Sequence, residues 1–404
     1  MDAGVVIVGG GQGGYQAAAS LRTEGYQGPV TLVSEEPHLP YQRPPLSKAF
    51  VQGKLDQDRL FLRPKAYYDD HQIDLRRGRR ATSIQRDSLS LELDSGIRIP
   101  YRWLILATGA RNRTLPVEGA WWDGVCYLRT VDEASTIKQR LDQAGHVVVI
   151  GGGFIGLEIA ATARVLGKEV TILEALPRLM ARVVAPVVSE YFLDAHRREG
   201  VEVRLNACVS SIQGTGGKVS AVVLENQTVL PADLVVVGIG VLPNVELAAA
   251  AGLAISNGIA VDELLRTSDE NIFAIGDCAE YPHSFSGCRV RLESVQNAVD
   301  HAVAVARTIA GKPSPYRAVP WFWSDQFDIR LQMAGLSTNF NQTVIRGMME
   351  SRKFSVFYFR DRQLLGIDSI NRPADHMAAR KLIAAGKLVT PEQAADESIN
   401  LKDL

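Results

Sequence analysis

The chain has 404 residues, of which 46% are hydrophobic and 22% charged, and its 44 Lys and Arg nearly balance its 45 Asp and Glu. A formal net charge of -1 creates no overall field that would favour nucleic acid or an anionic membrane, which argues against both as partners. The length suits two or three domains.

Cellular location is indicated by what the sequence lacks. The first apolar strand is expected from about Val5, which leaves no room for a cleavable leader, and no apolar run approaches the ~20 residues that span a bilayer. The four cysteines form no CxxC or CxxxxC pair, which favours a reducing compartment. We therefore expect a cytoplasmic protein with no membrane segment.

The first predicted elements are a strand and a helix in VVIVGGGQGGYQAAASL, residues 5–21. Gly9, Gly11 and Gly14 form G-x-G-x-x-G: the first allows a tight turn, the second lets a pyrophosphate approach, and the third lets helix pack on strand. The helix N-terminus offers unpaired N–H groups to phosphate. The next strand, VTLVSE, ends in Glu35, where a carboxylate can bind ribose hydroxyls.

Between this motif and its second copy, RRGRR at 76–80 predicts a solvated turn between strands, and a nucleic-acid site is the less favoured interpretation. LILATGA at 104–110 predicts a buried strand that ends in a glycine turn.

The motif returns in VVVIGGGFIGLEIAATARVLG, residues 147–167, with Gly151, Gly153 and Gly156. The following strand, EVTILE, ends in Glu174, which would repel a 2′-phosphate and so favours NADH over NADPH. Arg178, four residues on, leaves NADPH open. One glycine turn could serve helix packing alone, but two copies with the same flanking strands indicate two dinucleotide sites.

The remaining elements complete the fold prediction. LVVVGIGVLPN (234–244) and IFAIGDCAEY (272–281) indicate strands that end in glycine turns, a helix is expected from about 295 to 310, and KPSPYRAVP (312–320) resembles a linker. The segments IRLQMAGL, TVIRGMM, KFSVFYFR and QLLGIDSI, with a closing helix, indicate a small antiparallel sheet.

The predicted fold class is α/β, with two Rossmann-like dinucleotide-binding domains and a small α+β C-terminal domain. Two dinucleotides on one chain suit a resident flavin and an exchanging nicotinamide, because hydride can then pass from ring to ring. We expect an FAD-binding domain from residues 1–110 and 240–320, an NAD-binding domain at 111–239 and a C-terminal domain at 321–404.

These motifs carry a resemblance that covers essentially the whole chain. TSDENIFAIGDCAEY, ATGA and GIGVLPN, with the two glycine motifs, are similar to the two-dinucleotide flavoprotein superfamily of glutathione-reductase-like fold. PYQRPPLSK (40–48), ESVQNAVDHA (293–302) and PWFWSDQF (320–327) resemble the FAD-containing, NADH-dependent ferredoxin reductases of the putidaredoxin reductase type, which serve cytochrome P450 and ring-hydroxylating dioxygenase systems.

The resemblance implies an NADH:ferredoxin oxidoreductase of the EC 1.18.1 type. In disulfide-reducing members the turn that here reads PPLSK carries a redox cysteine pair, and this chain has none there. Electrons are therefore expected to leave the flavin directly and one at a time, for a [2Fe-2S] ferredoxin.

The resemblance also implies roles for single residues, and it implies no metal site. Lys48 is expected near flavin N5, where a cation helps hydride arrive, and Glu158 is expected to pair with Lys48 and touch the nicotinamide amide, so these two are the predicted catalytic residues. The predicted FAD-binding residues are Gly9, Gly11, Gly14, Glu35, Arg43, Lys48, Ala107, Arg129, Gly276, Asp277, Val295 and Trp323. The predicted NAD-binding residues are Gly151, Gly153, Ile155, Gly156, Glu158, Glu174 and Gly240.

Each of these roles has a plainer alternative. Glu158 could be a surface helix residue, Arg129 an exposed cation before a helix, and Trp323 an ordinary core aromatic. An acidic ferredoxin could dock on a basic surface formed by Arg289, Arg291, Arg307, Lys312 and Arg317, although a solvated loop and helix would give the same charges. On family grounds we expect a monomer.

Other functions on the same scaffold stay open from sequence. One is an NADH oxidase or a disulfide, dehydroascorbate or rubredoxin reductase, and the cysteine spacing argues against the disulfide branch. Another is a binding flavoprotein similar to apoptosis-inducing factor, which the near-neutral charge disfavours.

Overall fold

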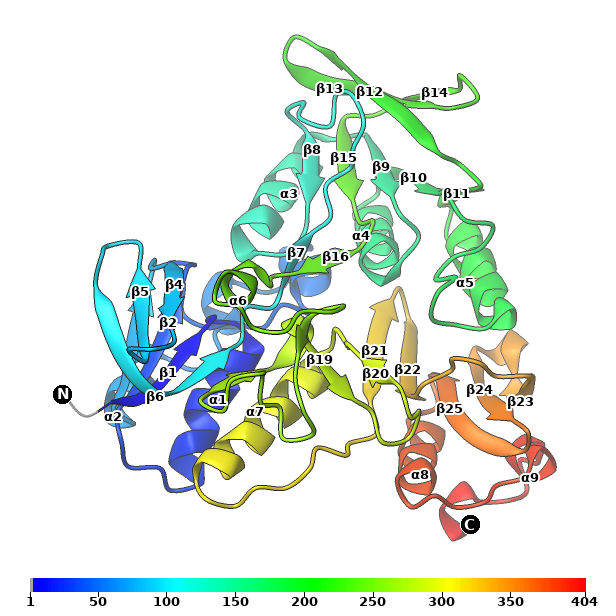
Figure 1. Cartoon of the computed structure of the whole chain (residues 1–404). Helices are drawn as coiled ribbons and strands as arrows, with labels where there is room; N and C mark the ends of the chain where they lie inside the picture. Colours follow the sequence, from blue (N-terminus) through cyan, green and yellow to red (C-terminus); the bar gives the residue numbers. More distant parts are fainter. Residues whose placement is uncertain (1–2) are drawn as a thin grey trace. The chain divides into compact units, whose positions relative to one another are not determined.

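The computed structural model describes residues 3–404 and divides into two compact units (Figure 1). The first unit comprises Met1–Gln42, Asp58–Arg111 and Leu242–Ala318, and the second comprises Arg43–Gln57, Asn112–Val241 and Val319–Leu404. Over residues 3–404, none of the helices combines the length and the apolar character needed to cross a bilayer.

The first unit is built on a seven-stranded sheet of order β3-β2-β1-β6-β5-β4, with β18 also paired to β6. Strands β3, β2, β1, β6 and β18 run parallel, whereas β5 and β4 add an antiparallel edge. The first strand is apolar throughout because it is buried on both faces. The strands are β1 Gly4–Val8, β2 Val30–Ser34, β3 Ile73–Arg77, β4 Ala81–Gln85, β5 Ser90–Leu93, β6 Arg98–Leu106 and β18 Ile272–Ala274.

Helices α1 (Gln12–Thr23) and α7 (Val295–Ile309) pack side by side in this unit, as the blue and yellow helices of Figure 1. Small buried residues, Ala17 and Ala18 among them, allow α1 to lie close to its neighbours. The unit also contains α2 Lys65–Asp70, α6 Glu246–Ala250, the 3₁₀ turns η2 Gln57–Leu60 and η3 Gly276–Cys278, and a small sheet of β17 Ile259–Ala260, β19 Ala279–Pro282 and β20 Arg289–Val290.

The second unit contains a five-stranded parallel sheet of order β11-β10-β9-β15-β8, beside an antiparallel sheet of order β12-β13-β14. The strands are β8 Val125–Tyr127, β9 His146–Ile150, β10 Glu169–Glu174, β11 Glu202–Leu205, β12 Val209–Thr215, β13 Lys218–Leu224, β14 Val229–Pro231 and β15 Leu234–Val237. Its helices are α3 Val131–Gln143, α4 Phe154–Val165 and α5 Pro186–Arg198, and the turn η1 Leu46–Phe50 packs on α3 and α4.

The C-terminal part of the second unit is an antiparallel sheet of order β21-β22-β25-β24-β23. Helix α8 covers β22 and β25, with Phe357, Ile367 and Leu382 in the core between helix and sheet. The elements are β21 Trp321–Gln326, β22 Ile329–Gly335, β23 Gln342–Met348, η4 Met349–Ser351, β24 Lys353–Arg360, β25 Gln363–Ile370, α8 Pro373–Ala384, α9 Pro391–Ala395 and η5 Leu401–Asp403. The chain passes between the units within β7 Ala110–Asn112 and β16 Val241–Pro243.

The predicted fold class is confirmed: each parallel sheet begins with strand, glycine turn and helix, and the chain ends in an antiparallel sheet with a helix. The RRGRR turn is confirmed too, since it joins β3 to β4 through Gly78 at a φ of 62°. The three predicted domain boundaries stay a prediction. The strand β21 and the sheet of β12, β13 and β14 were not predicted.

A carboxyl group lies at the centre of the C-terminal sheet. The Tyr358 hydroxyl donates to the Asp368 carboxyl and accepts from the Ala185 N–H at 2.9 Å. Burial raises the pKa of Asp368 from 3.8 to about 7, although the hydrogen bond from Tyr358 opposes the shift. The folded protein therefore holds a proton that the unfolded chain loses near pH 4.

This proton predicts a pH-dependent stability. Because the pKa is raised on folding, the stabilising contribution of Asp368 is complete below about pH 4 and is lost as pH rises to about 7. Asp368→Asn keeps an acceptor for Tyr358 but has no proton to lose. We expect its unfolding free energy, relative to that of the wild type, to rise by up to about 4 kcal/mol between about pH 4 and pH 8. Urea unfolding followed by circular dichroism measures this gain.

The matched control is Asp361→Asn, at an exposed carboxylate of the same unit. It should track the wild type at every pH. A constant difference between wild type and Asp368→Asn across this range would contradict the assigned proton.

Candidate functional site

The first glycine turn leaves space where a dinucleotide phosphate would lie. Gly9 has a φ of 119°, and a Cβ on Gly14 would lie 1.8 Å from the Gly9 carbonyl oxygen, so both positions require glycine for the protein's own packing. At Gly11, by contrast, nothing lies within 4 Å of a Cβ. Gly11 is also the N-cap of α1 and supplies no side-chain cap, so the first N–H groups of α1 are left to a ligand.

The second turn reproduces this geometry in the other unit. Gly151 has a φ of 111°, a Cβ on Gly156 would lie 2.0 Å from the Gly151 carbonyl oxygen, and nothing lies within 4 Å of a Cβ on Gly153. Gly153 caps α4 without a side-chain hydrogen bond, whereas the nearby α3 is capped by Thr130. Both turns therefore fit the pyrophosphate of a dinucleotide.

A carboxylate follows the second strand of each motif. Glu35 comes directly after β2, and its side chain is 73% exposed, 3.9 Å from Arg80 Nε. Glu174 ends β10, and its carboxylate accepts from the Gly152 N–H at 2.6 Å and the Leu176 N–H at 2.8 Å. Both carboxylates are placed at the carboxyl end of the strand, as the motif requires for a ribose.

Arg178 is bound by its own loop and by helix α5. Its guanidinium donates to the Val184 carbonyl at 2.7 Å, to the Ser189 hydroxyl at 2.9 Å and to the Ala181 carbonyl at 2.5 Å. A cation that is held by two carbonyl oxygens of its own loop and by a hydroxyl of α5 would have to break these bonds to bind a 2′-phosphate. The geometry therefore weakens the case for NADPH that Arg178 raised.

Several predicted flavin-binding residues lie with the first turn in the first unit. Ala107 follows β6 and approaches Gly9 so closely that its carbonyl oxygen would lie 2.1 Å from a Cβ there. Val295 begins α7, which is capped by Ser294, and Asp277 is in the turn η3. These residues all stand at strand ends or helix starts around one edge of the sheet.

Gly276, the glycine before Asp277, is held by a buried histidine. Its N–H donates to His301 Nδ1 at 3.2 Å, and burial lowers the pKa of His301 to about 3, so the ring is neutral and can accept. Tyr281 and Tyr316 pack edge-on against that ring at 4.6 and 4.5 Å. The backbone conformation of the Gly-Asp turn is thereby fixed.

The other predicted flavin-binding residues, Arg43, Lys48, Arg129 and Trp323, belong to the second unit. The Arg43 guanidinium donates to the carbonyl of Arg129, whose own N–H donates to the Glu133 carboxylate at 2.6 Å. Trp323 is partly buried on β21, with its ring 5.6 Å from that of Trp321. The flavin roles of these residues stay proposals.

Lys48 and Glu158 form the ion pair that the resemblance implied. Lys48 Nζ lies 2.8 Å from Glu158 Oε2, and the two side chains are 19% and 4% exposed. Glu158 is therefore not a surface helix residue. Lys48 lies in the middle of the π-helical turn η1, where its backbone departs from helical values, and its side chain reaches Glu158 on α4.

Two serines that the sequence analysis missed complete this site. The Ser47 hydroxyl donates to Glu158 Oε2 at 2.5 Å, and the Ser324 hydroxyl donates to Glu158 Oε1 at 2.7 Å. Thr162, one turn after Glu158 on α4, donates to the Ser47 carbonyl at 2.8 Å. A buried carboxylate with both oxygens occupied keeps one orientation, which is what a group that positions a substrate requires.

The last predicted nicotinamide residues flank the second turn. Ile155, in the first turn of α4, is 44% exposed. Gly240 has a φ of 99°, and its carbonyl accepts from the Arg113 N–H at 3.0 Å. Both are in the same unit as Glu158 and Glu174, so the structure brings the whole predicted NAD set into one unit.

The cysteines show no sign of redox pairing. All four, which lie within the described residues, are free. Burial raises the pKa of Cys126 to about 11 and also raises that of Cys278. A thiol with a raised pKa is a poor nucleophile, so neither buried cysteine is suited to the thiol–disulfide exchange of a dithiol relay.

Most cations of the proposed docking surface are paired. Arg289 is 3.1 Å from Glu280, Arg291 is 2.7 Å from Glu293, and Lys312 is 3.0 Å from Glu24. The structure thus neutralises much of the local charge that the sequence suggested, and the docking surface stays a prediction.

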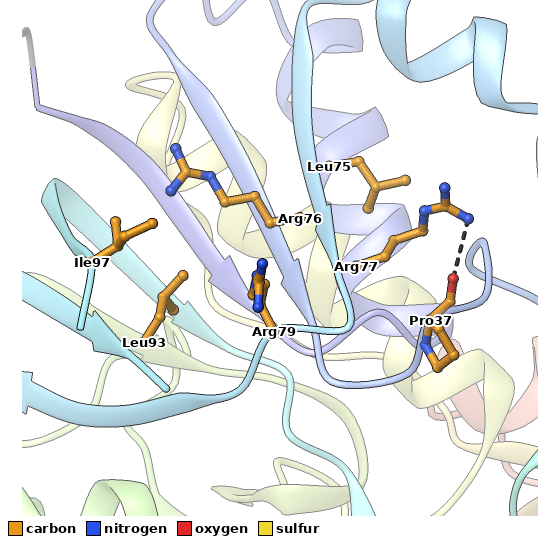
Figure 2. Close-up of a pocket in the computed structure, with 7 residues that line it drawn as sticks. All are labelled: Pro37, Leu75, Arg76, Arg77, Arg79, Leu93 and Ile97. Carbon is orange, nitrogen blue, oxygen red and sulfur yellow. Dashed lines mark hydrogen bonds between the residues drawn. The ribbon is translucent and has the colours of Figure 1, made fainter. Parts of the chain in front are cut away.

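A further basic groove, of about 590 Å³, lies in the first unit (Figure 2). Its arginines make local contacts: Arg76 pairs with Asp74 at 2.8 Å, and Arg77 donates to the Pro37 carbonyl at 3.1 Å. The groove is lined by Pro37, Leu75, Arg76, Arg77, Arg79, Leu93 and Ile97, none of which is a predicted site residue.

Known proteins match the chain along its whole length. The family model described as pyridine nucleotide-disulphide oxidoreductase matches residues 3–302, and the Reductase C-terminal model matches residues 321–404. Rhodocoxin reductase of Rhodococcus erythropolis is 52% identical over 98% of this chain and 93% of that protein. A rubredoxin-NAD(+) reductase of Pseudomonas putida is 41% identical over 91% of this chain and 96% of that protein.

Solved structures agree. The ferredoxin reductase for the CYP199A2 system of Rhodopseudomonas palustris has a TM-score of 0.98 at 50% identity and covers 100% of this chain and 99% of its own. The reductase in a covalent putidaredoxin reductase-putidaredoxin complex has a TM-score of 0.97 at 41% identity, with 100% and 98% covered. The predicted resemblance is confirmed, and the chain belongs to the pyridine nucleotide-disulphide oxidoreductase family, where its homologues are ferredoxin reductases of the putidaredoxin reductase type.

Proposed function

We propose that this protein is an NADH-dependent flavoprotein reductase that passes electrons one at a time to a [2Fe-2S] ferredoxin, which feeds a cytochrome P450 or a ring-hydroxylating oxygenase. One observation carries the proposal: the turn that would hold a redox cysteine pair in a disulfide reductase holds Ser47 and Lys48, both bound to Glu158. The relatives bear out the predicted enzyme class, since they are reductases of redoxins.

The cofactors are FAD and NADH, in agreement with the family. FAD supplies the step that a protein side chain cannot: it takes two electrons as hydride and releases them singly. The protein supplies binding and position. The open backbone at Gly11 and Gly153 receives the two pyrophosphates, and Glu35 and Glu174 receive the ribose hydroxyls.

Lys48 and Glu158 have complementary roles in this proposal. The ammonium of Lys48 places a positive charge where negative charge develops on the flavin ring, and a preorganised charge of this kind needs no rearrangement during the reaction. The Glu158 carboxylate, fixed by Ser47, Lys48 and Ser324, accepts a hydrogen bond from the nicotinamide carboxamide. Hydride transfer itself needs no general base, so neither residue has to change protonation.

The cellular location that best suits the chain is the cytoplasm. All four cysteines are free, which fits a reducing compartment.

A rubredoxin is the second candidate acceptor, because two rubredoxin-NAD(+) reductases are 41% and 40% identical to this chain. Like a ferredoxin, a rubredoxin takes one electron at a time at an iron site. The two candidates therefore differ in partner recognition and not in the chemistry at the flavin.

We expect the purified, FAD-loaded protein to oxidise one NADH for every two [2Fe-2S] ferredoxins reduced, because hydride carries two electrons and the cluster takes one. Stopped-flow absorbance with a panel of ferredoxins and a rubredoxin measures the rate for each acceptor. A variant with all four cysteines replaced by serine or alanine should keep at least about half the rate, since their thiols carry no electrons.

Oxygen consumption without any redoxin is the control for an NADH oxidase. NADH turnover that ferredoxin does not accelerate, or loss of ferredoxin reduction in the cysteine-free variant, would contradict the proposal. Faster reduction of rubredoxin than of every ferredoxin would move the assignment to the second candidate.

The glycine turns predict a separation of binding from folding. We expect Gly153→Ala to weaken binding of ADP-ribose at least about tenfold while it changes the free energy of unfolding by about 1 kcal/mol or less, because its methyl group meets the ligand and no protein atom. Gly156→Ala should instead cost about 2 kcal/mol or more of folding free energy, since its methyl group meets the Gly151 carbonyl. Titration calorimetry and urea unfolding distinguish the two effects, and equal losses of stability would refute the assignment.

Coenzyme preference is expected to depend on Glu174 and not on Arg178. Glu174→Ala should reduce the ratio of kcat/KM for NADH over that for NADPH by about tenfold or more, because the charge that repels a 2′-phosphate is removed. Arg178→Met, which removes a cation held by its own loop and by α5, should leave the ratio within about threefold. Steady-state rates with ferricyanide as acceptor give both ratios. A tenfold loss of NADPH use in Arg178→Met would show that this arginine does bind the 2′-phosphate.

A further inference from the structure

A line of buried hydrogen bonds lies behind Glu158 in the second unit. His196 Nε2 is 2.9 Å from Gln326 Oε1, Gln326 Nε2 is 3.1 Å from Ser324 Oγ, and Ser324 Oγ is 2.7 Å from Glu158 Oε1. The four residues are at most 4% exposed. They connect α5 through β21 to α4, and we call them the Glu158 relay.

The relay has a single direction. Burial lowers the pKa of His196, so its ring is neutral and carries one N–H. Nδ1 has no partner and Nε2 faces the amide oxygen of Gln326, which places the hydrogen on Nε2. The Gln326 amide then donates to Ser324, whose single hydroxyl proton goes to Glu158. Each donor points toward the carboxylate, so each bond strengthens the next.

The relay binds the Glu158 oxygen that the residues of the turn η1 do not bind. Ser47 and Lys48 both bind Oε2 of Glu158, whereas Ser324 binds Oε1. Without the Ser324 hydroxyl, the Lys48 pair could survive, but the carboxylate could rotate about it. The relay therefore fixes the orientation of the Glu158 carboxylate, which the ion pair with Lys48 alone does not fix.

We propose that Ser324, Gln326 and His196 are positioning residues for hydride transfer, which fix the rotation of the Glu158 carboxylate and, through it, the place of the Lys48 ammonium. The inference rests on the proposed function in one respect, that Lys48 and Glu158 act at the flavin and the nicotinamide. None of the three residues touches a reacting atom in this scheme.

The test compares two buried serines of the same antiparallel sheet. Ser324 and Ser355 are both 0% exposed, and the Ser355 hydroxyl donates to Asp375, away from Glu158. We expect Ser324→Ala to lower the limiting rate of flavin reduction by NADH about tenfold, whereas Ser355→Ala stays within about twofold of the wild type. Stopped-flow absorbance at saturating NADH measures this rate.

Further measurements distinguish a loss of Glu158 positioning from a general disruption of the protein. In Ser324→Ala the dissociation constant of NADH should change less than about twofold, and the isotope effect with 4-deuterated NADH should rise, because hydride transfer becomes slower relative to binding. Reoxidation of the dithionite-reduced enzyme by ferricyanide should be unchanged. Ser324→Thr, which keeps the hydroxyl, should recover most of the rate.

A second variant tests the direction of the relay. Gln326→Glu offers Ser324 a carboxylate as a competing acceptor, so it should slow flavin reduction more than Gln326→Met, which only interrupts the line. Equal rates for these two variants, or a Ser324→Ala variant no slower than Ser355→Ala, would overturn the inference.

A double-mutant cycle on unfolding gives a readout that does not use activity. Ser324→Ala and Glu158→Gln in the FAD-loaded protein should be non-additive by at least about fivefold in the unfolding equilibrium constant. Additive effects would overturn the inference. Ferredoxin takes no part in these measurements. A protein that accepts hydride but reduces no ferredoxin would therefore contradict the proposed acceptor, while the Ser324 and Gln326 variants would still decide the relay.

Discussion

The structure depends first on a close approach of backbone to backbone that only glycine permits. The carbonyl oxygens of Gly9 and Gly151 lie where a Cβ of the third glycine in each motif would be, at 1.8 and 2.0 Å. This approach brings the start of a helix directly over the end of a parallel strand. The first N–H groups of that helix then face the position of a pyrophosphate. The close packing of the glycines therefore places the helix N-terminus where it can bind phosphate.

The second constraint is the burial of a carboxylate. Removing Glu158 from water costs several kcal/mol unless its oxygens are hydrogen-bonded, and three donors from two other segments offset that cost. Because the donors come from the turn η1 and from β21, the charge ties both segments to α4. Glu158, a residue of α4, thus sets the position of Lys48.

Sequence predicted what depends on local spacing and missed what depends on tertiary burial. The glycines, Glu35 and Glu174 follow from a strand, a turn and a helix that are contiguous in the chain. Lys48 and Glu158 are far apart in sequence, and only the family resemblance paired them. Ser47, Ser324 and Gln326 belong to no local pattern, since a serine acquires this role only when a charge is buried beside it. The proposed basic surface shows the same limit: sequence lists its five cations, but Glu280 and Glu24, which pair with Arg289 and Lys312, come from other parts of the chain.

Hydride transfer to the flavin and electron transfer from it place different demands on the structure. Hydride moves as one particle over a short distance, so its rate depends on orientation, and the buried network of Glu158 supplies orientation at fixed charge. A single electron needs no such alignment, only an acceptor that can approach and no disulfide that intercepts it. The four free cysteines meet that second condition, because a thiol is already reduced and accepts electrons only after oxidation to a disulfide. Surface substitutions can therefore change the redoxin partner of a reductase in this family while the interior that receives hydride stays the same. This agrees with relatives of similar identity that are named as reductases of a ferredoxin in one case and of a rubredoxin in another.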